Sequence, residues 1–135
     1  MATNNEFITD ALRLLGVLGE GQSPSANQSS DALVVFNDMM ASLSADSINI
    51  GYAPQSDPTA DNGLGIEVRK AVKYLLAVDL APHYQRALDV AIVAQAMNAR
   101  NQLLRESMNL ALEPADMSHL PAGSANYAFR DITLL

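Results

Sequence analysis

The 135-residue chain contains no cysteine. This absence excludes disulfide bonds, a thiolate nucleophile and cysteine-ligated zinc or iron–sulfur centres. Long apolar runs are also lacking, because no stretch approaches the roughly 18 residues that a membrane span requires. The first residues combine neither basic charge nor an apolar segment, so we expect no signal peptide. These absences favour a small, soluble, intracellular type of domain with no obvious chemistry.

Basic charge is scarce as well. The chain has 8 Lys and Arg residues against 15 Asp and Glu residues, a formal net charge of −7. Residues 1–61 carry eight acidic residues and a single basic one, Arg13, whereas residues 62–135 carry seven of each sign. A net-acidic chain is repelled by nucleic acid, which disfavours sequence-specific DNA binding. The acidic excess is explained by solubility alone or by a functional surface. Such a surface would either lie near DNA without binding it or contact a basic partner.

The spacing of apolar residues predicts four helices. Residues 3–6 and 25–28 have the pattern of capping boxes, which begin the first two helices. The third helix is predicted from about Ile66 to Ala81 and the fourth from about Gln85 to Glu106. The predicted buried faces comprise Ile8, Ala11, Leu12, Leu15 and Leu18; Ala32, Val35, Phe36, Met39, Met40 and Leu43; Val68, Ala71, Val72, Leu75 and Leu76; and Leu88, Ile92, Ala96, Ala99 and Leu103.

Two segments do not have helical spacing. Prolines and glycines interrupt residues 47–65, in which residues 47–53 alternate polar and apolar side chains in the pattern of a short strand. Residues 109–135 contain Pro114 and Pro121 but keep many large apolar side chains, which disordered tails seldom do. We therefore predict an all-α protein, with a small four-helix bundle body over residues 1–108. An irregular, extended C-terminal arm over residues 109–135 would dock on this domain or on another chain.

Residues suited to catalysis or metal binding are few. Neither His83 nor His119 stands at a metal-ligand spacing from another histidine or a carboxylate. Glu6 and Asp10 are one helical turn apart, but nothing indicates the apolar surroundings that a catalytic carboxyl pair needs. No glycine-rich phosphate loop is present. We expect no enzymatic activity, no catalytic residues, no metal and no cofactor. One basic cluster, Arg69, Lys70 and Lys73, is either a solvated helix face or a partner site.

Several stretches together resemble a known family. They are residues 11–16, residues 36–46 within the block from Asp31 to Ile50, residues 63–72 running into residues 80–84, and residues 120–123 followed by a terminus that contains Tyr and Ile. In this order they are similar to the small adaptor proteins at the head-to-tail junction of tailed bacteriophages, also known as packaged-DNA stabilisation or head-completion proteins. The similarity covers nearly the whole chain, although no single motif is diagnostic.

The resemblance implies a virion structural protein in the neck, assembled in the host cytoplasm. Such adaptors form a ring, usually dodecameric, beneath the portal protein. The ring extends the DNA channel without sequence specificity, retains the packaged DNA and presents a platform for the tail tube or nozzle protein, with no membrane involved. The extended arm would reach into the portal, and the side chains available for this contact are Leu120, Pro121, Tyr127, Phe129, Arg130, Ile132, Leu134 and Leu135.

Three other functions remain open at this point. A small helical regulator would require a basic recognition helix, and none of the four predicted helices is strongly basic. A peptidoglycan-degrading virion protein would require a carboxyl with a raised pKa beside a second carboxylate in a groove. A different neck or tail-completion protein would share the helical body but bind another neighbour.

Overall fold

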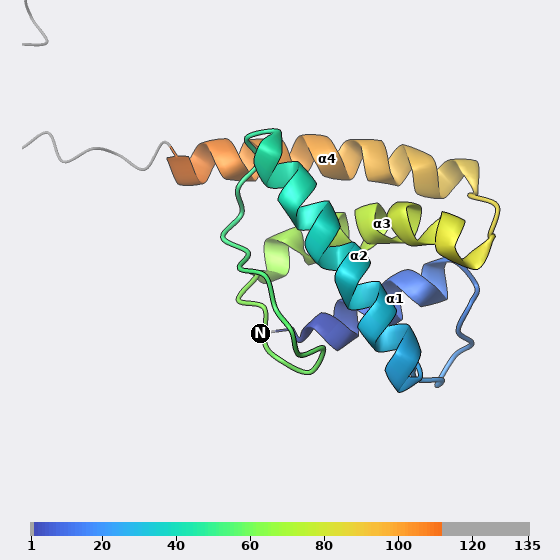
Figure 1. The fold of residues 1–135 in the computed structure, drawn as a ribbon. Coiled ribbons are helices and arrows are strands. Elements are labelled where there is room, and N and C mark those ends of the chain that lie inside the picture. The colour runs from blue at the N-terminus through green and yellow to red at the C-terminus, as the bar shows by residue number, and fades with distance from the viewer. Residues whose placement is uncertain (1, 112–135) are drawn as a thin grey trace, which may run out of the picture.

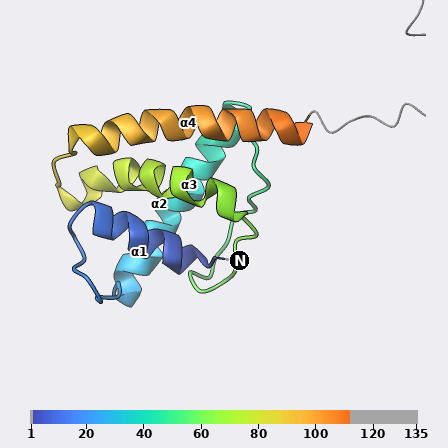
Figure 2. The ribbon, with the colours of Figure 1, turned by 180° about the vertical axis from the view of Figure 1, so that it is seen from behind.

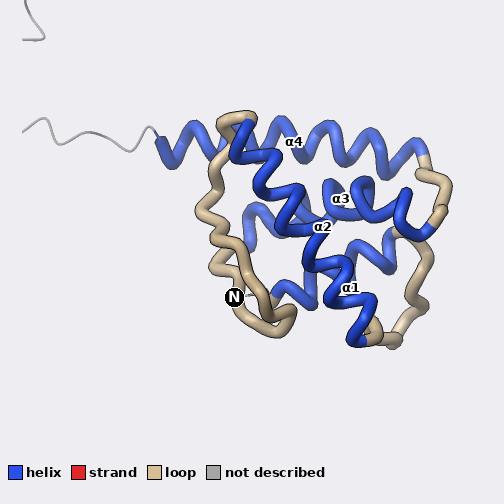
Figure 3. Tube along the Cα trace, in the orientation of Figure 1, coloured by secondary structure: helices blue, strands red, loops and turns tan. Residues whose placement is uncertain are grey.

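The computed structural model describes residues 2–111 and is all-α over that range. No strand occurs in the described part of the chain (Figure 3), where the only β-type pairing is an isolated bridge between Thr3 and Asp61. The prediction of an all-α protein with four helices is confirmed. The elements are α1 (Asn4–Leu14), α2 (Ala26–Ala45), α3 (Ile66–Leu80), the short 3₁₀ helix η1 (Ala81–Tyr84) and α4 (Val90–Ala111).

Helix α3 occupies the centre of the fold. It packs against α1, α2 and α4. Figures 1 and 2 show α4, α3 and α1 stacked in one layer, with α2 crossing one face of that layer. Within residues 2–111, this arrangement leaves the side of α4 that faces away from α3 without a neighbouring element.

Both predicted capping boxes are present. The Thr3 hydroxyl accepts a hydrogen bond from the Glu6 amide, and the Glu6 carboxylate accepts one from the Thr3 amide. Ser25 and Gln28 exchange the same pair of bonds at the start of α2. Each box provides partners for amides that would otherwise be unpaired in the first turn, which explains why both helices begin where the sequence predicts.

The core is built from the predicted apolar faces. Phe7 and Phe36 are fully buried with ring centroids 5.9 Å apart, and the two rings join α1 to α2. Met39 and Met40 are both buried as core residues, as expected. Of the predicted inward residues, Val35, Leu75, Leu88 and Ile92 pack against the core while only partly buried, and the others are buried.

The strand predicted over residues 47–53 is wrong. Ser47 and Gly51 both have left-handed backbone conformations, with φ of 65° and 82°, which break an extended run. Side-chain hydrogen bonds to Asn37 hold this segment in place instead. The Asn37 side chain accepts a hydrogen bond from the Tyr52 hydroxyl and donates one of 2.8 Å to the Gln55 carbonyl oxygen. Tyr52 also meets Phe36 edge-on at 5.0 Å, so α2 holds the segment in place.

The predicted start of the fourth helix is also wrong. Gln85 has a left-handed conformation, with φ of 52°, and ends η1, so α4 begins only at Val90. The Asp89 side chain accepts a hydrogen bond from the Ala91 amide and thus starts the helix. At its other end α4 continues to Ala111, beyond the predicted Glu106.

Polar contacts connect α4 to the segment that follows α2. Buried Ser107 accepts a hydrogen bond of 2.8 Å from the Asn49 amide and donates one to the Ser47 carbonyl oxygen. Arg100 forms a salt bridge of 2.6 Å with Asp46. These contacts fix how α4 lies on α3 and therefore which of its faces remains exposed.

Candidate interaction surfaces

A groove lies where α2 passes the end of α3 and η1. Its volume is about 690 Å³. Ala32, Val35, Met39 and Leu80 form an apolar floor, and Val34, which is 60 % exposed, stands at the margin. The polar lining residues are Asn27, Gln28, Asp31, Asp38, Ser42, Asp79, His83 and Tyr84. We call this the acidic groove, because its lining combines an apolar floor with three carboxylates.

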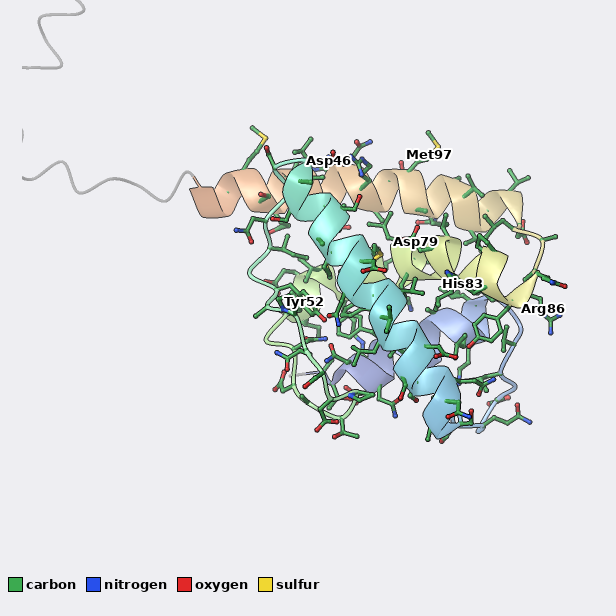
Figure 4. The ribbon with its side chains drawn as sticks, viewed as in Figure 1. Asp46, Tyr52, Asp79, His83, Arg86 and Met97 are labelled. Atoms are coloured by element: carbon green, nitrogen blue, oxygen red, sulfur yellow. The ribbon has the colours of Figure 1, made fainter. Side chains whose placement is uncertain are left out.

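The carboxylates of the acidic groove, Asp31, Asp38 and Asp79, take part in no salt bridge within residues 2–111. Partial burial raises the pKa of the Asp79 carboxyl, and the nearby His83 opposes part of this rise. Burial likewise raises the pKa of the Tyr84 hydroxyl, and the negative charge of Asp31 raises it further. Figure 4 shows Asp79 and His83 beside α2. The groove is suited to a cationic or amphipathic occupant.

Among residues 2–111, the acidic groove holds no cluster of metal ligands, but Asp79, whose pKa is raised, lines it together with the carboxylates of Asp31 and Asp38. Within the described residues, no three His, Asp or Glu side chains lie close enough together to hold a metal ion. Glu6 and Asp10 lie elsewhere, and each already has a partner: Glu6 closes the first capping box, and Asp10 forms a salt bridge with Arg69. His119 lies outside the described residues. Over the described range, no helix has the length and hydropathy to cross a membrane.

The three cations of the predicted basic cluster have different neighbours. Arg69 lies 3.3 Å from Asp10 and 5.8 Å from the centre of the Phe7 ring, so it connects α3 to α1. The Lys73 ammonium lies 5.8 Å from the centre of the Tyr74 ring. Lys70 is exposed and lines a shallow pocket between α3 and α4. The cluster is therefore spread over two sides of α3, and Arg69 contributes to packing.

A second surface was missed by the sequence reasoning, which considered only one face of the fourth helix. Five apolar side chains follow another side of α4: Val90 is 82 % exposed, Val93 37 %, Met97 67 %, Leu104 41 % and Met108 52 %. The signal was present in the sequence, because Val90, Met97 and Leu104 recur every seven residues, or two helical turns. Only the packing of Ala99 and Leu103 against the core, with Ala96 buried beside them, shows which face is free. We call these five residues the α4 stripe.

The predicted portal-binding residues cannot be placed in the fold. Leu120, Pro121, Tyr127, Phe129, Arg130, Ile132, Leu134 and Leu135 all lie outside the described residues. They remain a prediction from the sequence and from the resemblance.

Comparison with known proteins identifies the family. A family model described as "P22 tail accessory factor" matches residues 1–132, which is nearly the whole chain. A search of the curated proteins finds no match. The chain therefore belongs to the P22 tail accessory factor family of phage tail-associated proteins.

Proposed function

We propose that the protein is a head-to-tail adaptor of a tailed phage. In this role it binds the portal protein as a ring, extends the DNA channel, retains the packaged DNA and connects the tail tube or nozzle protein. The observation that carries the proposal is the family match over residues 1–132, because it covers the body and most of the C-terminal segment together. A match to the helical body alone would fit many small bundles equally well.

The charge distribution supports a position around DNA. The net charge is −7, and residues 1–61 carry eight acidic residues against the single basic residue Arg13. An acidic channel wall repels the phosphate backbone, so DNA can pass without being held. Such a wall allows packaging and ejection through one ring without sequence preference.

In this proposal the helical body makes the contacts within the ring, and the C-terminal arm binds the portal. All buried residues within the described range lie between Asn4 and Ser107, so the body does not depend on the segment from Leu120 onward for its core. The apolar side chains of that segment are then available to a partner. Aromatic anchors such as Tyr127 and Phe129 usually carry a large share of the binding energy in such contacts.

We expect the purified protein to be a monomer or weak oligomer at micromolar concentration and to form a ring only on the portal. The reason is that the exposed apolar area of the body is modest, whereas the portal supplies a symmetric template. Native mass spectrometry with and without the portal protein of the same phage measures this directly. A stable ring without portal contradicts the template role. A failure to bind portal at all contradicts the adaptor function and favours another neck or tail-completion role.

We also expect neither catalysis nor specific DNA binding. The chain has no cysteine, and none of its helices is strongly basic. A peptidoglycan zymogram should show no clearing, and duplex affinity should be negligible at physiological salt. Clearing that disappears when a single carboxylate such as Asp79 is changed to the amide contradicts the first expectation. Duplex binding that persists at physiological salt contradicts the second.

A further inference from the structure

The α4 stripe lies on a different side of α4 from the residues that pack on the core, roughly 120° around the helix axis at 3.6 residues per turn. Residues 96, 99 and 103 face inward and are at most 6 % exposed, whereas the five stripe residues are between 37 % and 82 % exposed. From Val90 to Met108 the stripe extends for about 27 Å, at 1.5 Å per residue. Figure 4 shows Met97 pointing away from the other helices. Single exposed apolar residues are common, but a continuous row of this length is typical of an interaction surface.

The acidic groove has complementary properties. It runs along α2 from Asn27 to Ser42, which is roughly 22 Å of helix, close to the length of the stripe. Its floor is apolar, and its carboxylates at positions 31, 38 and 79 give it negative charge. Beside the stripe, α4 carries the exposed Arg105, which forms no salt bridge within residues 2–111, whereas Arg100 is already paired with Asp46. An apolar row beside a cation therefore matches an apolar floor flanked by carboxylates.

We propose that the α4 stripe of one copy docks in the acidic groove of the next copy. The inference rests on the ring of the proposed function and names the two faces that form its contact. Because the stripe and the groove are different surfaces of one chain, the contact is head-to-tail. Repetition of such a contact produces a ring when the rotation closes, whereas a contact between two α4 stripes would stop at a two-fold dimer.

The size of this contact accounts for the expected weak self-association. A helix face about 27 Å long and about 10 Å wide covers roughly 300 Å² on one partner. Stable interfaces bury about 800 Å² on each partner, so this contact alone belongs to the transient class. Copies aligned on the portal meet at a much higher effective concentration, which turns a weak contact into a persistent one.

Disulfide trapping tests the proposal, and the absence of native cysteine makes each introduced thiol unique. Val34→Cys places a thiol at the middle of the groove side, and Met97→Cys places one near the middle of the stripe. Both positions are well exposed, 60 % and 67 %, so both full-length variants should fold. The two variants, one with a mass tag, are mixed with a mild oxidant, both with and without purified portal. We expect the mixed 34–97 product to exceed statistical pairing, and to increase when portal is present.

Asn98→Cys is the matched control, because residue 98 is also exposed on α4 but lies on another side of the helix from the stripe. Replacing Met97→Cys by this control should lower the mixed product about tenfold, because the intact stripe still docks but the thiol at position 98 lies beyond the Cβ–Cβ distance of about 4 Å that a disulfide requires. Predominance of the 97–97 product overturns the proposal in favour of a two-fold dimer. If the 34–97, 34–34 and 97–97 disulfides form in random proportions both with and without portal, the proposal is wrong and the stripe binds a different partner.

The two proposals fail in different ways. If portal binds the chain but the mixed disulfide shows no excess, the adaptor function stands and the stripe-to-groove contact is wrong. If portal does not bind and the mixed disulfide still predominates, the contact stands and the adaptor function is wrong.

Discussion

Deletion of residues from Leu120 onward is expected to abolish attachment to the portal and to leave the helical body folded. The truncated chain keeps every residue of α1–α4, including the whole buried core between Asn4 and Ser107. What it loses is a segment with aromatic and aliphatic side chains and, at Arg130 and Asp131, two charges that could fix its register on the portal. Circular dichroism measures the body, and co-sedimentation with purified portal measures the attachment.

The double substitution Tyr127→Ala, Phe129→Ala provides a finer version of the same experiment. The two residues are two apart, so in an extended segment they point to the same side. If they are the anchors, their loss should cost about 2 kcal/mol or more of binding free energy, close to a 30-fold weaker affinity. Attachment that survives the truncation at normal strength means that the segment is not the anchor. Lys70 and Lys73 then become the next candidates, since Arg69 is engaged with Asp10.

The substitution Phe36→Ala is expected to lower the free energy of unfolding by about 3–5 kcal/mol, which is a large part of the stability of a small domain. Phe36 is fully buried and contacts two other rings, Phe7 at 5.9 Å and Tyr52 at 5.0 Å. Its removal leaves a cavity between α1 and α2 and also releases the segment that Tyr52 holds against α2. Urea denaturation followed by circular dichroism measures the change.

Val34→Ala is the control on the same helix. Its side chain is 60 % exposed, so its truncation should change stability by no more than about 0.5 kcal/mol. A variant at position 36 whose unfolding midpoint equals that of the unaltered protein would contradict the role of this ring as the centre of the core. Burial of the Tyr52 hydroxyl raises its pKa to about 12, so it remains a hydrogen-bond donor to Asn37 well into the alkaline range.

The local rules of helix formation determined much of this fold from the sequence. Both capping boxes form as predicted, since the bonds involve residues only three apart and need no distant partner. The buried faces of α1 and α3 follow from apolar spacing for the same reason. The two incorrect predictions occur where backbone conformation decides: the left-handed residues at Ser47, Gly51 and Gln85 are not marked by apolar spacing. Ser47 and Gly51 make a loop of the segment predicted as a strand, and Gln85 ends η1, so that α4 begins later than predicted.

The surfaces, in contrast, depend on tertiary structure. The acidic groove joins positions 31 and 38 on α2 to position 79 at the end of α3, which approach each other only because α2 crosses the layer of the other helices. The α4 stripe is visible in the sequence as a repeat of seven residues, but such a repeat is equally typical of a core face. What distinguishes the two is that Ala99 and Leu103 pack against the core and Ala96 is buried beside them, whereas the stripe residues remain 37–82 % exposed in the described part of the chain. Sequence spacing determines that a helix has apolar faces, and only the packing of its neighbours decides which face remains free for another molecule.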